Sequence, residues 1–244
     1  MIVNTQVDGW EIIYHRAHAL LAAQIAAHWN QEDSPQRLTD TIAAISHHDD
    51  LEREWEKEDL LTPAGAPKDF TQENKTSVEK LRHHIEEALY RGRWVALLTS
   101  MHTCFLKEGS KDKSPELLEF LQKQRDLQER WRQELGIEQE EVQSSYHFMR
   151  WCDRLSLILC QHQIPDNERT LEINIGPDGR KYEIAQSQEG AISVFPWCFA
   201  KDKITVYVET SHLSEIKFED NDSLKAALTN APRKYQEWTL VKSD

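Results

Sequence analysis

The chain has 244 residues, of which 39% are hydrophobic and 29% are charged, and its formal net charge at pH 7 is -13. This length allows one large domain or two small ones, and the composition is typical of a globular protein. The acidic balance argues against sequence-independent binding of nucleic acid or of an anionic membrane, because both depend on an excess of lysine and arginine. A small anionic substrate is compatible with this net negative charge if a metal ion or local basic residues bind the substrate.

The four cysteines, at positions 104, 152, 160 and 198, have no CxxC spacing, and three of them lie in apolar runs with helical spacing. Reduced, buried cysteines of this kind are typical of a cytosolic protein. The first residues lack a basic region followed by an apolar run, and no stretch of about 18 apolar residues occurs. We therefore expect a cytoplasmic protein with neither a signal peptide nor a membrane span.

The N-terminal part of the chain changes from strand-like to helical spacing. Loose alternation around an Asp-Gly turn signal predicts two short strands over residues 2–6 and 10–13. Apolar side chains at helical spacing predict a first helix over 14–29. A second helix is expected to start near Pro35, which is a typical first-turn residue, and to run to about Lys57.

Four more helices are predicted before residue 165, over 72–90, 94–106, 115–135 and 139–161. Gly92 is expected to break the chain between the first two of them. The helix over 115–135 is so rich in charged and amide side chains that we interpret it as a solvated surface helix.

After residue 165 the pattern changes to alternation, which predicts a small antiparallel sheet with strands over 171–175, 181–184, 191–194 and 204–208, a short helix over 223–230 and a closing strand over 235–242. The N-terminal strands are expected to join this sheet, because alone they bury little surface. The prediction is therefore a mainly α protein. Residues 1–165 would form a multi-helix core with the N-terminal strand pair, and residues 166–244 a small β-rich subdomain packed on it.

The stretch 41–55 sets two histidines beside two aspartates within the second predicted helix. At helical spacing, His48 shares one apolar face with Ile45 and Trp55, so we expect His48 to be buried and His47 and Asp50 to point elsewhere. A buried imidazole needs partners for its ring nitrogens, and an adjacent carboxylate is a neighbour that also suits a metal ion. The alternative is an ordinary core histidine beside a surface acid pair.

Three more ligand-type side chains, those of His18, His102 and Asp153, fall on apolar faces of other predicted helices. Asp153 has only Arg150 and Ser156 as polar neighbours at helical spacing. A buried carboxylate in that position costs on the order of several kcal/mol unless it is paired, protonated or bound to a metal. Each residue alone is more often an ordinary core residue, but their joint occurrence indicates a metal site.

Imidazole and carboxylate ligands suit Mn, Fe, Co, Ni or Zn, and Mg where carboxylates and water dominate. A mononuclear site made from His18, His48, Asp49 and Asp153 would leave coordination positions for water and substrate, as metal-assisted hydrolysis requires. His102 would then be a further ligand or a general acid that faces the phosphate.

The order His18, His48-Asp49, Asp153 resembles the H...HD...D signature of the HD-domain metal-dependent phosphohydrolases. More closely, the chain is similar to a bacterial family of uncharacterised proteins with an HD-like helical core. This similarity covers most of the chain and rests on the stretches 18–29, 44–50, 65–70, 99–102, 153–157 and 195–199. One departure is that Leu51 stands where we expect a Gly-Trp pair after the doublet, which affects the rim of the site more than its ligands.

The resemblance implies an HD-like helical bundle and a divalent metal held by His18, His48, Asp49 and Asp153, where activated water attacks a phosphate ester. The candidate catalytic residues are Asp49, His102 and Arg154. Among the basic residues, Arg154 follows the last ligand and would contact the substrate phosphate or form a surface salt bridge.

Several other residues have weaker or open assignments. Arg16 and Lys107 are weaker phosphate-binding candidates than Arg154. For a second metal, His83 is expected to be exposed among charged neighbours, whereas the role of His84 stays open.

The expected function is a metal-dependent phosphohydrolase of HD type that acts on a small phosphorylated or nucleotide-like molecule. A non-catalytic HD-like binding or regulatory protein is the main alternative. Oxygen chemistry at a di-iron site is a third, which needs more ligands than these residues supply. The sequence contains no glycine-rich phosphate loop, no GxSxG motif and no cysteine paired to a base, and its oligomeric state and metal identity are not readable.

Overall fold

The computed structural model describes residues 1–51, 54–56, 58–72, 76–109, 114–167 and 169–243. Its helices are α1 (His15–Ala27), α2 (Leu38–His47), α3 (Val78–Leu89), α4 (Arg93–Glu108), α5 (Pro115–Leu135), α6 (Gln139–Cys160) and α7 (Asn221–Asn230). Its strands are β1 (Ile2–Gln6), β2 (Gly9–Ile13), β3 (Thr170–Ile175), β4 (Lys181–Gln186), β5 (Ile192–Phe195), β6 (Lys203–Leu213) and β7 (Arg233–Val241).

The strands form one seven-stranded sheet in the order β1-β2-β6-β7-β5-β4-β3. The prediction of a mainly α protein, an HD-like bundle with a small antiparallel sheet, is therefore wrong, and the fold is mixed α/β. The sheet is also mixed, because β5 pairs with β7 in parallel while the other neighbours are antiparallel. The N-terminal strand pair joins the sheet through β2 and β6, as expected.

Two long strands explain why the sheet is larger than predicted. Strand β6 has 11 residues and pairs with β7 over most of its length. Its exposed and buried residues alternate as far as Thr210, past Val208, where the predicted strand stops, and the strand continues to Leu213. That continuation provides the edge on which β2 pairs, in register from Trp10 with Leu213 to Ile12 with Ser211. The proposed division of the chain at residue 165 stays a prediction, since the sheet takes strands from both sides of it.

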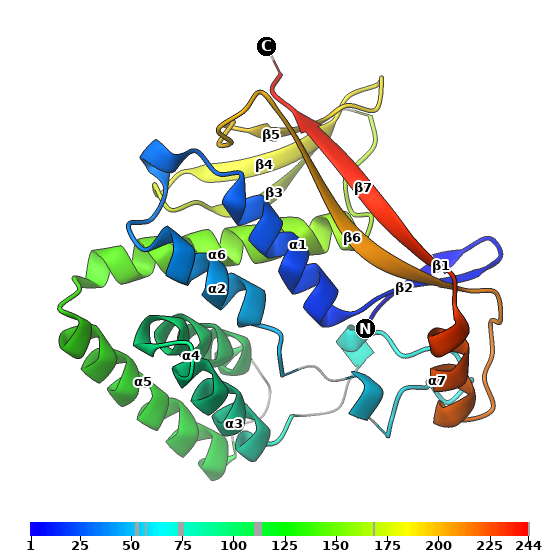
Figure 1. Cartoon of the computed structure of the whole chain (residues 1–244), viewed down its shortest axis with the longest axis horizontal. Coiled ribbons are helices and arrows are strands. Elements are labelled where there is room, and N and C mark those ends of the chain that lie inside the picture. The colour runs from blue at the N-terminus through cyan, green and yellow to red at the C-terminus, as the bar shows by residue number, and fades with distance from the viewer. Residues whose placement is uncertain (52–53, 57, 73–75, 110–113, 168, 244) are drawn as a thin grey trace.

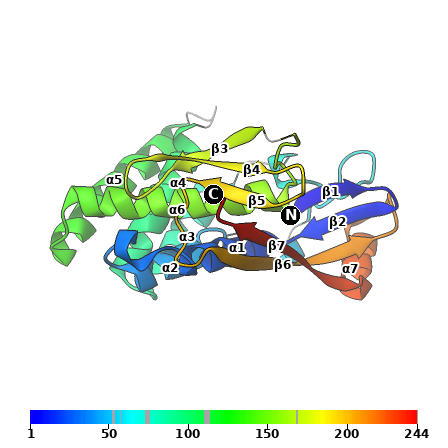
Figure 2. The same cartoon turned by 90° about the horizontal axis from the view of Figure 1, so that it is seen from above.

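Helices α1 and α6 lie between the sheet and the other long helices (Figures 1 and 2). Helix α6 contacts β3, and α1 contacts β6. On their other side α2 and α4 contact α6, and α3 and α5 pack on α4. The helices that carry the predicted ligands are thus direct neighbours.

An aromatic cluster joins the helices to the sheet. The Trp29 ring lies 4.8 Å from Trp151 of α6, 5.7 Å from Tyr182 of β4 and 6.4 Å from Phe199, as centroid distances. Aromatic side chains of this size contribute much of the energy of a core. The aromatic stretch 195–199 therefore contributes to sheet packing through Phe199.

Most predicted helices are confirmed, but two differ at their ends. Helix α2 ends at His47, and the predicted end near Lys57 falls on a residue outside the described part of the chain. Helix α3 begins at Val78, after Ser77 accepts a hydrogen bond from the Lys80 amide, and not near 72. The break at Gly92 is confirmed by its φ of 118°, which favours glycine.

No helix in the described part of the chain is both long enough and apolar enough to cross a membrane.

Candidate metal centre

The end of α2 positions the two central residues of the cluster. In a continuing helix the Ile45 carbonyl would accept a hydrogen bond from the Asp49 amide. Here the imidazole of His48 donates to that carbonyl instead, with Nδ1 2.6 Å from the Ile45 oxygen. The helix ends, and the chain turns so that the Asp49 side chain faces α1.

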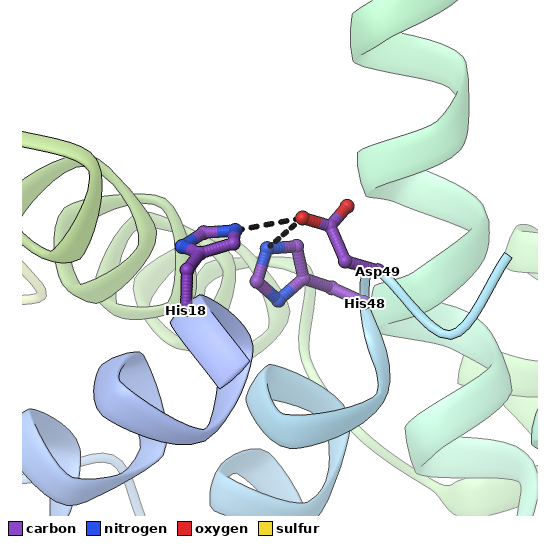
Figure 3. A group of neighbouring side chains, drawn as sticks. All are labelled: His18, His48 and Asp49. Atoms are coloured by element: carbon purple, nitrogen blue, oxygen red, sulfur yellow. Dashed lines mark hydrogen bonds and ion pairs between the residues drawn. The ribbon is translucent and has the colours of Figure 1, made fainter. Parts of the chain in front are cut away.

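The Asp49 carboxylate meets two imidazoles (Figure 3). Its Oδ2 lies 2.7 Å from His18 Nε2 and 3.5 Å from His48 Nε2. From α6, Asp153 Oδ1 lies 3.3 Å from His48 Nε2 and 3.8 Å from His18 Nε2. The two carboxylates and two ring nitrogens thus surround one small volume between α1, α2 and α6.

In each ring, the hydrogen bond made by Nδ1 fixes the tautomer. Ser156 Oγ donates to the Asp153 carbonyl oxygen, so at 2.8 Å it must accept the Nδ1 hydrogen of His18. His48 likewise donates its Nδ1 hydrogen to the Ile45 carbonyl. In their neutral forms both histidines therefore turn a lone pair on Nε2 toward the carboxylates. Lone pairs and carboxylate oxygens that face each other repel unless a cation lies between them. A histidine that binds a metal through one ring nitrogen typically donates the hydrogen of its other ring nitrogen to an acceptor, as both histidines do here.

The electrostatics of the cluster favour a positive charge at its centre. Burial alone would lower the pKa of His48, but Asp49 and Asp153 outweigh it and raise this pKa to about 10. Burial would raise the pKa of Asp49, but His48 and His18 hold it well below its usual range. Without a metal, a proton on His48 supplies the charge that a bound cation would otherwise supply.

His102 extends the cluster from α4. Its ring centroid lies 5.2 Å from that of His48, and its buried Nδ1 has no hydrogen-bond partner among the described residues. Burial lowers the pKa of His102 to about 4 despite the nearby Asp153. A neutral imidazole suits a ligand role better than that of a general acid at neutral pH.

Two groupings in the described chain could hold a metal ion, and they share His48. The first is His18, His48 and Asp49; the second is His48, His102 and Asp153. In each, one ligand atom per residue lies within 4.8 Å of the others. All five predicted side chains are thus brought together.

The family of the chain can be assigned independently of this geometry. The model of a family described as protein of unknown function, DUF3891, matches residues 1–215. The chain belongs to the DUF3891 family. No curated protein and no solved structure matches it. The matched part includes all five cluster residues and ends just after β6.

Three expectations about the helix end are wrong in the DUF3891 chain. His47 was expected to point away from the core but is only 3% exposed, because the ring of His84 packs against it with centroids 4.7 Å apart. Asp50 is not fully solvent-facing, since its Oδ2 lies 2.5 Å from His47 Nδ1. Trp55 was expected on the buried face but is 45% exposed, because α2 ends before reaching it.

The remaining candidates lie outside the cluster. Arg154 contacts Gln163 beyond the end of α6, at 3.3 Å, so its phosphate role stays a prediction. Arg16 donates to the Asp50 carbonyl oxygen. His83 is exposed, as expected, whereas the buried His84 donates from Nε2 to the carbonyl oxygen of His48 at 3.1 Å.

Sequence reasoning missed two supporting residues. Ser156 appeared only as a polar neighbour of Asp153, although its spacing of three residues on the same helix could have indicated contact with a ligand. Glu54 comes after α2 in the chain, and no pattern in the sequence indicated a role for it. Its buried Oε1 accepts a hydrogen bond from the His15 amide at 3.0 Å, at the first turn of the helix that carries His18.

Glu54 serves as a remote cap for α1, because the N-cap residue Tyr14 makes no side-chain cap bond. Burial would raise the pKa of Glu54, but its bonds to His15 and the nearby ammonium group of Met1 outweigh burial and lower this pKa to about 2. A folded-state pKa below the unfolded value means that the ionised carboxylate stabilises the fold above about pH 4.5, and that this contribution is lost as the pH falls toward 2.

We expect Glu54→Gln to lower the free energy of unfolding by about 2 kcal/mol at pH 7, since glutamine keeps an acceptor but no charge. The difference from wild type should narrow as the pH falls from about 4.5 toward 2, because the carboxylate becomes protonated first in the unfolded chain and then in the folded one. Urea unfolding with a chelator present measures this, and the exposed Glu58→Gln is the control. An equal difference at pH 7 and pH 3 would contradict the capping role of the charge.

Proposed function

We propose that the chain is a divalent-metal-dependent phosphohydrolase whose ion is held by His18, His48, Asp49 and Asp153. One observation supports this above all: two buried imidazoles have their Nδ1 hydrogens fixed by separate acceptors and turn Nε2 toward two carboxylates. The resemblance to the HD signature supports the same ligand set.

The residues of the cluster have separable roles in this proposal. A divalent ion there would supply charge neutralisation at phosphorus and a lowered pKa for attacking water. Asp49 and Asp153 are the partly exposed members, with 20% and 16% of their side chains accessible, so the substrate approaches from their side. The second Asp49 oxygen is turned away from both histidines (Figure 3) and would orient water. His102 completes the ligand set from the interior.

Metal analysis combined with hydrolysis tests the proposal. We expect at least one divalent ion per purified chain, and phosphate release from phosphomonoesters or nucleotides that chelation abolishes and added metal restores. His147→Ala, which removes a partly buried histidine of α6 that lies outside the cluster, should change neither result. If no transition metal or Mg is present or can be loaded, the proposal is wrong. A bound metal without hydrolysis of any substrate would favour the binding or regulatory alternative. Two bound irons with an optical absorption band would favour oxygen chemistry.

A further inference from the structure

Arg150 of α6 lies beside the metal centre with its hydrogen-bond donors unused. Its guanidinium lies over the Phe105 ring of α4, with Cζ 3.9 Å from the ring centroid. The Arg150 side chain is only partly exposed, and it has no hydrogen bond or ion pair with any of the described residues. Because stacking on a ring fixes the plane of a guanidinium, its N–H donors are held in place for an acceptor.

The ring under Arg150 adjoins the metal ligands. The centroid of the Phe105 ring lies 6.5 Å from that of His102, which in turn lies 5.2 Å from that of His48. Burial lowers the pKa of His102, Asp153 opposes this shift, and the charge of Arg150 adds to the lowering. The guanidinium is therefore near enough to act on a group bound at the metal centre.

Arg150 precedes the ligand Asp153 by three residues on the same helix. An arginine and an aspartate at this spacing can form an ion pair. These two do not pair, because Asp153 Oδ1 faces His48 Nε2, 3.3 Å away. The carboxylate is thus available to a metal ion and the guanidinium to an anion. Both side chains are partly exposed, so a ligand from the solvent can reach them.

Three other arginines near the site are already engaged. Arg16 and Arg91 contact the Asp50 carboxylate at 3.6 and 3.3 Å. Arg154, which the sequence favoured as the phosphate contact, donates to a glutamine side chain beyond the end of α6 at 3.3 Å. Of these four arginines, Arg150 alone has no acceptor among the described residues, although the chain has a net charge of -13.

We propose that Arg150 binds the phosphate group that reacts at the metal centre, and that it selects phosphomonoesters over phosphodiesters. The inference rests on the proposed function. A guanidinium can bind two phosphate oxygens side by side through its planar donor fork, and the metal ion would hold a third. A monoester has three phosphate oxygens free of ester bonds, whereas a diester has two. Phe105 acts as a positioning residue, because its ring holds the fork in place.

Calorimetric titration of the metal-loaded protein with inorganic phosphate and with dimethyl phosphate tests the inference. Inorganic phosphate stands for the monoester group and dimethyl phosphate for the diester. Wild type should bind inorganic phosphate about tenfold more tightly or better, and Arg150→Gln should weaken that binding by about tenfold to a hundredfold. Arg150→Lys keeps the charge but loses the fork, so it should restore only part of the affinity.

The metal affinity of each variant is measured first. It should not fall in Arg150→Gln, because this substitution removes a repelling charge and no ligand. The matched control is Arg37→Gln, since Arg37 also lies over an aromatic ring, that of Trp94, at 5.4 Å. Arg37 pairs with Glu141 at 3.8 Å and lies at the opposite end of α2 from His48. Arg37→Gln should bind phosphate as wild type does, and melting curves show which variants are folded.

The outcomes separate this inference from the proposed function. Weaker phosphate binding by Arg150→Gln but not by Arg37→Gln, with metal affinity retained, supports the inference. Unchanged phosphate affinity in Arg150→Gln, full rescue by lysine, or equal binding of the two phosphates by wild type overturns it and leaves the metal centre standing. Parallel loss of metal and phosphate affinity assigns Arg150 a packing role and also overturns it. If wild type binds no metal, the proposed function fails and the inference fails with it.

Discussion

Asp153→Ala should lower the affinity for divalent metal by about a hundredfold or more. Asp153 Oδ1 is 3.3 Å from His48 Nε2, and it also belongs to the grouping with His102. The substitution therefore removes a charged ligand from a site whose remaining carboxylate is Asp49. Without Asp153, the Nδ1 hydrogens of the two histidines stay fixed, but the site loses half of the negative charge that attracts the cation.

Metal content after purification and the change in melting temperature on adding metal both measure this effect. Wild type should be stabilised by metal, since a ligand that binds only the folded state raises its stability, whereas Asp153→Ala should show little shift. The exposed Asp126→Ala on α5 serves as the control and should behave as wild type does. A variant at position 153 with unchanged metal content and an unchanged shift would show that the cluster is not the metal site.

Three members of the cluster could be predicted because they lie on regular amphipathic helices. His18, His102 and Asp153 are within α1, α4 and α6, and each shares a face with buried apolar residues of the same helix. Helical spacing alone therefore placed each side chain on an inward face. That the faces converge at one point is a property of how α1, α2, α4 and α6 pack, which spacing does not contain.

The end of α2 could not be predicted, because a side chain decides it. The bond from the His48 ring to the Ile45 carbonyl competes with a helical backbone bond, and no periodicity distinguishes the two. Once the helix ends, the pattern that separated His47 from His48 no longer applies. The burial of His47 against His84 is then set by contacts between α2 and α3.

The fold class was wrong for a related reason. Each strand was found near its observed position from alternation, but the pairing of Ile12 with Ser211 and of Ile192 with Leu240 joins distant parts of the chain. Polar residues also hid the second half of β6, where Thr210 and Ser211 are buried in place of apolar side chains. Local patterns identify strands, whereas the size of a sheet depends on long-range pairing.

Ser156→Ala should weaken metal binding by about tenfold to a hundredfold, although Ser156 itself would not touch the ion. Its hydroxyl oxygen accepts the Nδ1 hydrogen of His18 at 2.8 Å and so holds the Nε2 lone pair toward Asp49. Without that acceptor, the ring can place its hydrogen on Nε2 or rotate, and both changes remove a ligand from the site. The fold should be preserved, because alanine favours a helix more than serine does.

Ser145→Ala is the matched control, since Ser145 lies on the same helix, is equally buried, and its Oγ has no hydrogen-bond partner among the described residues. Isothermal titration with metal compares the affinities, and nitrogen NMR of the metal-free protein reports the His18 tautomer. We expect a change in both measurements for Ser156→Ala and in neither for Ser145→Ala. If both variants lost affinity equally, with His18 unchanged, the effect would come from helix packing. The hydroxyl of Ser156 would then have no part in orienting the ligand.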